Sequence, residues 1–404
     1  MKLLHTADWH IGHRLHGFDR AHEHQAFLNW LIETIEERKI DGLLVCGDIF
    51  DTANPSSASW QLFYQFLATL RQRFPVLNVV IIGGNHDSPS KLDAPHELLK
   101  SFRLHLIGAI ERDDTGHLNT EKLAIPLTDE NGHIVAWCAA VPFLRSADLR
   151  GDPDSDDRLI SGVREVYQTV YASIPKTETQ PLIALGHAYL QNGELSALSE
   201  RKVLGGNQHA LPVSVFEGAD YVALGHLHLA QQLNENTVYS GSPIPLSMNE
   251  RNYPHQVVEL AITNGQVQVT DRIPVPLTVQ MLRIPEHVKP FETVLEQLNA
   301  FLPEVKPVDE QPFLEVRVLL DKPQPRLREQ ILTALKDKPV RLAKIHTEYT
   351  GHGLGVADQL QSTLEQLDAT DVFRLCYQRQ YQNEPDVALL QCFDALIHEL
   401  ENQE

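Results

Sequence analysis

Five short motifs rich in aspartate and histidine contain the residues of this sequence that could do chemistry together. They are Asp8-Trp9-His10, Gly47-Asp48-Ile49-Phe50-Asp51, Gly84-Asn85-His86-Asp87, Gly186-His187 and Gly225-His226-Leu227-His228. Their carboxylate, imidazole and carboxamide groups suit hard or borderline divalent ions such as Mn²⁺, Mg²⁺, Fe²⁺ or Zn²⁺. The motifs contain no cysteine, which argues against a structural zinc site.

The candidate metal ligands are more numerous than one ion needs. They are Asp8, His10, Asp48, Asn85, His187, His226 and His228. Such a set is about right for two ions that share a carboxylate, and two ions roughly 3.5–4 Å apart form a clamp for phosphate ester hydrolysis. Each motif is weak evidence by itself, because Asp-x-His and Gly-His pairs often occur by chance. The whole set in this order predicts a shared two-metal site.

Each motif follows a short apolar run with the composition of a β-strand. We expect strands over 2–5, 42–46, 79–82, 134–140, 182–185, 221–224 and 238–240, and helices over 22–37 and 58–70. Fully apolar strands between helices predict an α/β core whose sheet is covered on both faces. Ligands in such folds lie beyond the carboxyl ends of the strands, so the motifs should meet on one rim. Four of the expected ligands come directly after a glycine, which fits tight turns or close approach to the metals.

The pattern changes after residue 272. The segment 273–276 is predicted to be a linker, followed by strands over 279–284, 313–320 and 340–346 and helices over 291–301 and 325–336. A glycine-rich joint at 351–355 precedes helices over 360–367 and 386–401, the second with an apolar stripe suited to docking. We therefore predict a core over 1–275, a capping and DNA-recognition domain over 276–350, and a helical tail over 351–404. The polar stretch 148–157 is expected to be a solvated loop.

Charge is distributed unevenly along the chain. The 404 residues carry a net charge of −20, which by itself argues against binding to nucleic acid. One stretch, 322–344, is basic, and its lysines and arginines are Lys322, Arg326, Arg328, Lys336, Lys338, Arg341 and Lys344. This stretch could hold a DNA backbone or form a solvated surface, and the sequence leaves both interpretations open.

Cysteine usage and hydropathy bear on where the protein works. The four cysteines are scattered without a C-x-x-C pair, as expected for a reducing compartment. The chain begins without the apolar stretch of a signal peptide and contains no apolar run near 18 residues, so we expect a cytoplasmic protein. Trp9 is expected to pack beside the site rather than to act as a DNA wedge. His13, His16, His22 and His24 are expected at exposed loop and helix positions rather than at a third metal site.

The order of the motifs resembles that of the calcineurin-like metallophosphoesterases. Within that superfamily the sequence is most similar to the bacterial SbcD family, which are nuclease subunits related to the DNA break-repair nucleases. The runs that carry this resemblance are His5–Gly12, Gly47–Thr52, Gly84–Ser88, Ala223–His228 and Tyr239–Ser247. The motifs cover about the first 250 residues, and the cap and tail match the family in layout. The resemblance implies a sandwich of two packed β-sheets flanked by helices, with a small α+β cap.

The resemblance also implies a role for each site residue. The first ion would be held by Asp8, His10, Asp48 and His228, and the second by Asp48, Asn85, His187 and His226. Mn²⁺ is the usual metal of the family, with Mg²⁺ or other divalent ions as alternatives. His86 would face the scissile phosphate and help to protonate the leaving oxygen, which an imidazole can do near neutral pH. Asp51 could orient His86, as carboxylates often do for imidazoles.

The implied activity is a DNA nuclease with double-strand exonuclease and single-strand or hairpin endonuclease action. Such a subunit works with SbcC, an SMC-like ATPase, in DNA repair, recombination and replication at the nucleoid. The helical tail would dock on SbcC, and the nuclease would be a homodimer within a heterotetramer. The alternatives are a small-molecule phosphodiesterase or protein phosphatase and an inactive scaffold. Thr52-Ala53 and Asp87 disfavour a protein phosphatase, which usually has Arg-Gly and Glu there, and the complete ligand set disfavours a scaffold.

Overall fold

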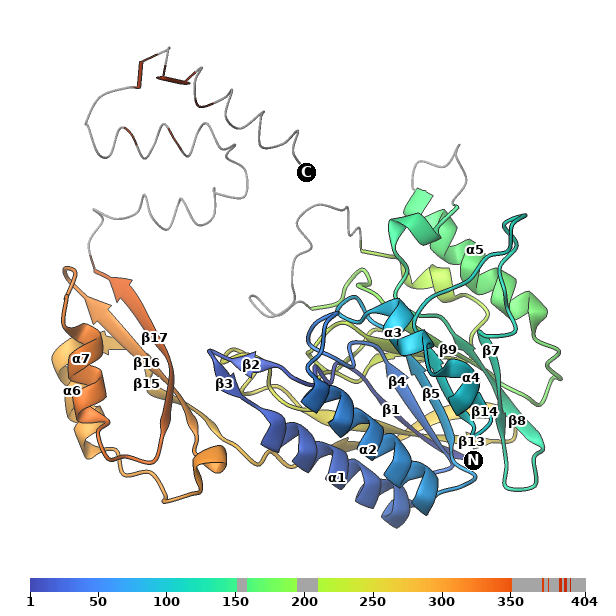
Figure 1. Cartoon of the computed structure of the whole chain (residues 1–404), viewed down its shortest axis with the longest axis horizontal. Helices are drawn as coiled ribbons and strands as arrows, with labels where there is room; N and C mark the ends of the chain where they lie inside the picture. The colour runs from blue at the N-terminus through green and yellow to red at the C-terminus, as the bar shows by residue number, and fades with distance from the viewer. Residues whose placement is uncertain are drawn as a thin grey trace. The chain divides into compact units, whose positions relative to one another are not determined.

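Two six-stranded β-sheets are the main elements of residues 1–282 in the computed structural model (Figure 1), which describes residues 1–150, 158–194 and 210–350 and a few positions after 372. The first sheet has the order β14-β13-β1-β4-β5-β6. Its strands are β1 (Lys2–Thr6), β4 (Gly42–Cys46), β5 (Asn78–Ile82), β6 (Leu104–Ile107), β13 (Gln256–Thr263) and β14 (Gln266–Pro274). Strands β1, β4, β5 and β6 are parallel, whereas β13 and β14 are added in antiparallel fashion.

The second sheet has the order β11-β12-β10-β9-β8-β7. Its strands are β7 (Ala124–Thr128), β8 (Ile134–Ala140), β9 (Leu182–His187), β10 (Tyr221–Gly225), β11 (Gln231–Gln232) and β12 (Thr237–Tyr239). The four central strands, β8, β9, β10 and β12, are parallel, and β7 and β11 pair in antiparallel fashion at the two edges. The carboxyl ends of the parallel strands therefore define one rim in each sheet.

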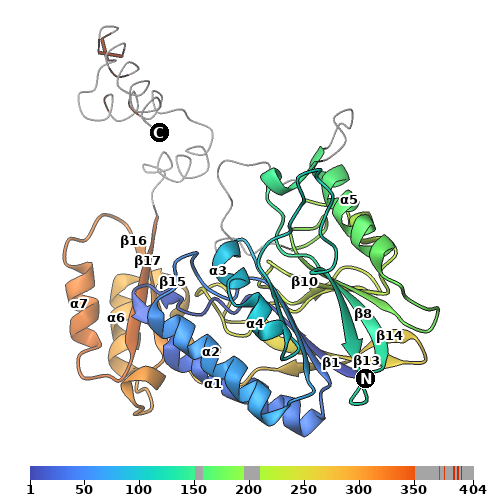
Figure 2. The same ribbon diagram turned by 45° about the vertical axis from the view of Figure 1, so that its right-hand side comes forward.

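Alternating side chains divide the core into two layers. In β4, Leu44 and Cys46 point into a core shared with the second sheet, while Leu43 and Val45 point into a core shared with helices. Helices α1 (Ala21–Arg38) and α2 (Ser57–Arg73) cover that outer face of the first sheet and lie side by side (Figure 2). Helix α5 (Arg158–Ser173) packs on the second sheet. The predicted α/β class is confirmed, as is the two-sheet sandwich that the resemblance implied.

The shorter elements connect these layers. They are the hairpin β2 (Arg14–Leu15) and β3 (Phe18–Asp19), the helices α3 (Pro89–Asp93) and α4 (His96–Lys100), and the 3₁₀ turns η1 (Ser146–Asp148), η2 (Val213–Phe216) and η3 (Val308–Glu310). None of the helices in the described ranges is long and apolar enough to span a membrane.

Most of the expected strands occur where the apolar runs predicted them, and β4, β8 and β16 (Phe313–Leu320) match residue for residue. The expected linker at 273–276 is a correction. Ile273 belongs to β14, where it pairs with Val257, and Ile273 and Val275 are both buried in the core beneath the helices. Two prolines made this stretch resemble a connection, but proline is tolerated at the end of an edge strand such as β14.

Two predictions about single side chains near the site had different outcomes. Trp9 is fully buried and packs edge-to-face against Phe27 and Phe66, as expected for a packing residue. His24 was expected to be exposed but is only 1% exposed, with ring nitrogens 2.9 Å from the Trp9 carbonyl and 3.0 Å from the Arg20 carbonyl. His24 therefore supports the chain between the first motif and α1, a role that the run of histidines did not reveal.

The C-terminal part of the described chain contains a three-stranded sheet of order β15-β16-β17. Strands β15 (Met281–Pro290) and β17 (Arg341–Tyr349) flank β16, and helices α6 (Phe291–Ala300) and α7 (Leu327–Ala334) connect them. This β-α-β-α-β order agrees with the order of elements predicted from the sequence. One compact unit comprises 1–282, 302–315 and 338–344, and the other comprises 283–301, 316–337 and the chain from 345 onward. The expected joint and tail helices lie outside the described residues, as does most of the loop 148–157, and the domain boundaries stay predictions.

Candidate metal centre

All five motifs occupy the carboxyl ends of parallel strands. Asp8 follows β1, Asp48 follows β4 and Asn85 follows β5, whereas His187 ends β9 and the Gly225–His228 run leaves β10. Because β4 packs against both β9 and β10, the rims of the two sheets meet, and the motifs face one another there. The motifs therefore converge as expected, but they come from the rims of two sheets rather than one.

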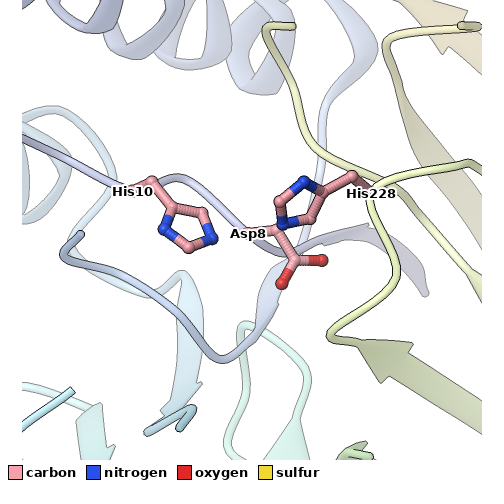
Figure 3. Close-up of side chains that lie close together, drawn as sticks. All are labelled: Asp8, His10 and His228. Carbon is pink, nitrogen blue, oxygen red and sulfur yellow. The ribbon is translucent and has the colours of Figure 1, made fainter. Parts of the chain in front are cut away.

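The side chains form a compact cluster with two halves. We call Asp8, His10 and His228 the first half, and Asn85, His187 and His226 the second half, with Asp48 between them. In the first half one potential ligand atom from each residue lies within 4.8 Å of the others, and Figure 3 shows these three side chains turned toward one another. The same limit holds for Asp48, His187 and His226, and for Asp48, His10 and His86. Together with Asn85, whose Oδ1 lies 2.9 Å from Nε2 of His187, all seven expected ligands are brought together.

Backbone strain is concentrated in this cluster. The residues Asp8, His10, Asp48 and His226 have φ angles of 55°, 48°, 49° and 100°, in a region that side chains other than glycine rarely adopt. Gly47 has a φ of 88°, and a Cβ there would collide with the ring of His187. A Cβ at Gly84 would likewise collide with the carboxylate of Asp48. Such strain persists where the surrounding structure holds the backbone firmly, as it does at functional sites.

Hydrogen bonds between the loops keep that geometry in place. The Asp8 amide donates to the Gly47 carbonyl at 3.0 Å, and the His10 amide donates to the Asp48 carbonyl at 3.0 Å. The His226 amide donates to the Asp8 carboxylate at 2.9 Å, which ties the second sheet to the first. The His86 amide donates to Oδ1 of Asp48 at 2.8 Å. The loops that carry the first, second, third and fifth motifs are thus each attached to at least one other loop.

In the second half, the expected ligands also contact one another. Oδ1 of Asn85 lies 2.9 Å from Nε2 of His187 and 3.0 Å from Nδ1 of His226. The other ring nitrogen of His187, Nδ1, lies 2.8 Å from the Cys46 carbonyl and donates its hydrogen there, which leaves Nε2 as the nitrogen that can bind a cation. Oδ2 of Asp48 lies 3.3 Å from the same Nε2.

The first half contains buried polar atoms without partners. Neither ring nitrogen of His10 has a hydrogen-bond partner among the described residues, although the side chain is only 3% exposed. Its Nε2 lies 3.6 Å from Oδ2 of Asp48, too far for a hydrogen bond. Buried polar atoms are rarely left without a partner. A divalent cation bound between the His10 ring and the neighbouring carboxylates would provide the missing partner. The donor set therefore fits the pair of metal ions that the sequence resemblance implies.

The pKa values of the cluster are strongly displaced. Burial opposes ionisation of the carboxyl groups of Asp8 and Asp48. For Asp8 burial prevails and raises the pKa. For Asp48 the neighbouring histidines, above all His187, outweigh burial and lower the pKa. Burial also disfavours the charged form of His187, but the two carboxylates raise its pKa to about 9. Burial, reinforced by the charge of His187, lowers the pKa of His226 to about 3. Such opposed shifts are typical of functional sites.

His86 lies beside the cluster, with its ring centroid 4.8 Å from that of His10. Its Nδ1 donates to the main-chain carbonyl of Asp51 at 2.7 Å. The Asp51 carboxylate instead lies 3.4 Å from Nδ1 of His10. The contact between Asp51 and His86 therefore goes through the backbone, and the side chain of Asp51 faces the first half. Burial lowers the pKa of His86, an effect that the Asp48 carboxylate partly offsets.

Sequence reasoning missed two buried carboxylates that hold the site. Asp87 accepts three main-chain hydrogen bonds, from Ile49 at 3.0 Å, Phe50 at 2.9 Å and Gly84 at 2.9 Å, and so joins the second motif to the third. Glu250 lies 3.1 Å from Nδ1 of His228. Asp87 could have been suspected from its place in the third motif. Glu250 lies beyond all five motifs, and no local pattern marks it.

The basic stretch does not form one uniform surface. Lys322, Arg326, Arg328 and Lys336 are exposed. Arg341 is half-buried, with Nε 2.8 Å from the Gln311 carbonyl and its guanidinium 3.8 Å from the centre of the Phe313 ring. Lys338 and Lys344 are half-buried, and Nζ of Lys344 lies 3.9 Å from Glu315. The exposed residues near α7 are the ones whose charge faces solvent.

Comparison with known proteins agrees with the fold and the motifs. Residues 1–230 match the family model of the calcineurin-like phosphoesterases, and residues 278–381 match a model described as the type 5 capsule protein repressor C-terminal domain. A relative in Rhodobacter capsulatus, named as the SbcD subunit of the nuclease SbcCD, is 38% identical over 85% of this chain and 86% of its own length. Proteins of the same name in Escherichia coli and Bacillus subtilis are 29% and 31% identical, over 92% and 66% of this chain and 92% and 67% of their own lengths.

Proposed function

The chain belongs to the SbcD family of the calcineurin-like phosphoesterases, and we propose that it is a metal-dependent DNA nuclease. The observation that supports this most directly is the buried cluster on the joined rims, in which His10 has two ring nitrogens without hydrogen-bond partners among the described residues. Structural histidines are normally satisfied, so this cluster is built for a ligand that the protein itself does not provide.

We assign the first cation to the first half together with Asp48, and the second cation to the second half together with Asp48. Two Mn²⁺ ions are the proposed pair, with Mg²⁺ as an alternative, because the donors are oxygen and imidazole nitrogen. When bound, such ions neutralise the anionic phosphodiester and lower the pKa of a water molecule toward neutrality. The strained loops around Asp8 and Asp48 hold the carboxylates in place before any cation arrives.

His86 is the proposed proton donor. Its Nδ1 hydrogen is held by the Asp51 carbonyl, so the ring is fixed with Nε2 as the nitrogen that remains for the substrate. In the protonated ring Nε2 carries the hydrogen that is transferred to the leaving sugar oxygen. The pKa of His86 is lowered by burial, which makes the imidazolium a better donor, and Asp48 limits that lowering. Asp51 acts on His86 through its main chain.

The proposed substrates are double-stranded ends, cut as an exonuclease, and hairpins or single strands, cut as an endonuclease. The proposed partner is SbcC, since the relatives are named as subunits of SbcCD. We propose that the tail, residues 351–404, docks on SbcC and that the nuclease forms a homodimer there. Such an enzyme would act at the cytoplasmic nucleoid, in repair, recombination and replication.

The experiment incubates the purified chain with a linear duplex that ends in a hairpin, with Mn²⁺ or with EDTA. The reactions are run alone and with SbcC plus ATP, and His86→Asn serves as the matched control for contaminating nucleases. We expect Mn²⁺-dependent cutting that SbcC increases and that His86→Asn loses. If the DNA stays intact in every reaction while a small phosphodiester is hydrolysed, the site is a phosphodiesterase and the nuclease assignment is wrong.

DNA binding by the exposed basic residues is tested separately. Reversing the charge of Arg326 and Arg328 should weaken DNA binding and reduce the dependence of the affinity on salt, because each phosphate contact releases counterions. The comparison is a charge reversal at Arg73, an exposed arginine of α2 that is paired with Glu36. An unchanged salt dependence in the Arg326 and Arg328 variant would reject the role of these residues in DNA binding.

A further inference from the structure

A buried carboxylate supports one of the expected metal ligands. Glu250 is fully buried in the segment between β12 and β13, and its Oε1 lies 3.1 Å from Nδ1 of His228. The same carboxylate accepts a hydrogen bond from the Leu246 amide at 2.8 Å and from the Ser247 hydroxyl at 3.2 Å. Two donors apart from the His228 ring thus converge on one carboxylate, as expected for an ionised group that has been removed from water.

This contact decides which nitrogen of His228 can bind a cation. An ionised carboxylate only accepts hydrogen bonds, so Nδ1 of His228 must carry the hydrogen. In the neutral ring the electron pair is then on Nε2. A carboxylate behind an imidazole also increases the electron density that the ring offers to a cation. Glu250 therefore sets both the orientation and the donor strength of His228.

The segment that carries Glu250 is itself firmly held. The ring of His255 lies between two carbonyls, with Nδ1 2.9 Å from Ser242 and Nε2 3.0 Å from Glu250. The guanidinium of Arg20, which is 1% exposed, donates to the Pro245 carbonyl and is paired with Glu23. The carboxylate of Glu250 is therefore positioned by buried contacts at both ends of the segment rather than by the metal site.

The other histidines of the cluster have weaker supports. Nδ1 of His187 donates to a neutral main-chain carbonyl, that of Cys46. The Asp51 carboxylate stays 3.4 Å from Nδ1 of His10, and that contact does not meet hydrogen-bond geometry. Among these three rings, His228 is the one that donates to a full negative charge. This difference places the strongest support in the first half.

We propose that Glu250 is a positioning residue that, through His228, strengthens binding of the first cation and leaves the second unaffected. The proposal rests on the proposed two-metal function. It is tested by Mn²⁺ binding to the full chain, measured calorimetrically and by competition with a chromophoric chelator. We expect two binding events in the wild type. In Glu250→Gln one dissociation constant should rise by about 10- to 100-fold, and the other should stay within about twofold.

Two matched variants separate this effect from damage to the fold. Glu259→Gln changes another buried glutamate, which is paired with Arg38 and Lys2 away from the site, and should leave both dissociation constants unchanged. Ser247→Ala removes a neighbouring hydrogen bond to Glu250 without touching His228 and should change Mn²⁺ binding little. If Glu250→Gln does not fold, Glu250→Asp keeps the charge but shortens its reach, and it should weaken the same site.

A double-mutant cycle gives a readout that a purely structural role would not affect. If Glu250 acts through His228, adding Glu250→Gln to His228→Gln should produce no further loss of Mn²⁺ affinity. Unchanged constants in Glu250→Gln, equal weakening of both sites or additive losses in the cycle would each overturn the proposal while leaving the nuclease function standing. A wild type that binds no Mn²⁺ would overturn the proposed function together with this inference.

Discussion

The two halves of the metal centre differ in what holds their side chains. In the second half the side chains hold one another, because Oδ1 of Asn85 contacts a ring nitrogen of both His187 and His226. In the first half the two histidine rings form no hydrogen bond with another ligand among the described residues. The ring of His228 is held by Glu250, whereas neither ring nitrogen of His10 has a hydrogen-bond partner within the described chain. The ligand side chains of the second half therefore hydrogen-bond to one another, whereas, in the described ranges, those of the first half do not.

This difference indicates what a cation would contribute to each half. A cation that enters the second half must replace hydrogen bonds that already exist between the ligands, so part of its binding energy offsets their loss. A cation that enters the first half satisfies buried atoms that have no other partner. The first half should therefore gain more stability from metal, whereas the second half should keep its geometry better without metal. The following predictions test this contrast.

The largest effect is expected at Asp48, the carboxylate that the two halves share. Asp48→Asn removes the charge that faces both His10 and His187, so both cations and roughly 10³-fold or more of the turnover should be lost. Metal content by elemental analysis and nuclease turnover measure the two losses. Asp271→Asn, which alters a partly exposed carboxylate paired with Arg38, is the control. Unchanged metal content in Asp48→Asn would exclude the shared role.

A smaller effect is expected from acid, and it should act on both halves together. His5 joins β1, which leads to Asp8, to β10, which leads to His226, with Nε2 3.1 Å from the Leu224 carbonyl and Nδ1 3.2 Å from the Tyr221 hydroxyl. Burial lowers the pKa of His5 to about 4 in the folded protein, from an ordinary value of 6.5. The unfolded chain therefore takes up the proton first as the pH falls from 6.5 toward 4.

The free energy of unfolding should consequently decrease across that range, with a contribution from His5 of up to about 3 kcal/mol below pH 4 and none above pH 6.5. Urea denaturation at pH 7 and at pH 4.5 measures the change. His5→Gln retains a hydrogen-bond donor but does not titrate, so it should show a smaller decrease than the wild type. Equal decreases in both proteins would show that His5 is not responsible.

The smallest effect contrasts the halves directly, in protein freed of metal by EDTA. His187→Leu leaves the buried Cys46 carbonyl without its donor and should lower the free energy of unfolding by about 1–3 kcal/mol. His10→Leu removes ring nitrogens that lack partners and should change it by no more than about 0.5 kcal/mol. Urea denaturation of the two variants and the wild type measures these changes in the free energy of unfolding. Similar losses in both would remove the distinction between the halves.

Much of the architecture follows from local patterns in the sequence. The apolar runs place β4, β8 and β16 correctly because burial on both faces requires continuous apolar residues. Polar residues directly after such runs converge because parallel strands end on the same rim, which brings Asp8, Asp48 and Asn85 together. Position 47 is a glycine for a local reason as well, because its φ of 88° is unfavourable for residues with a side chain.

Other features were decided only by the tertiary structure. Local periodicity predicts one strand at a time, so it could not tell that the cluster draws on two sheets, nor that Ile273 continues β14 instead of starting a linker. Which atom of Asp51 contacts His86 depends on the path of the loop after β4, and the burial of His24 depends on how α1 lies over the first sheet.

The support of His228 by Glu250 shows the same limit most clearly. The two residues are 22 positions apart and belong to no common motif, and their contact exists because His255 and Arg20 fold the intervening segment back against the rim. By itself the sequence determined the kinds of donor atoms and the strands that present them, because residue type and local hydrophobic pattern are enough for both. Only the tertiary structure decided which donors have partners, because hydrogen bonding between distant segments depends on how the whole chain packs.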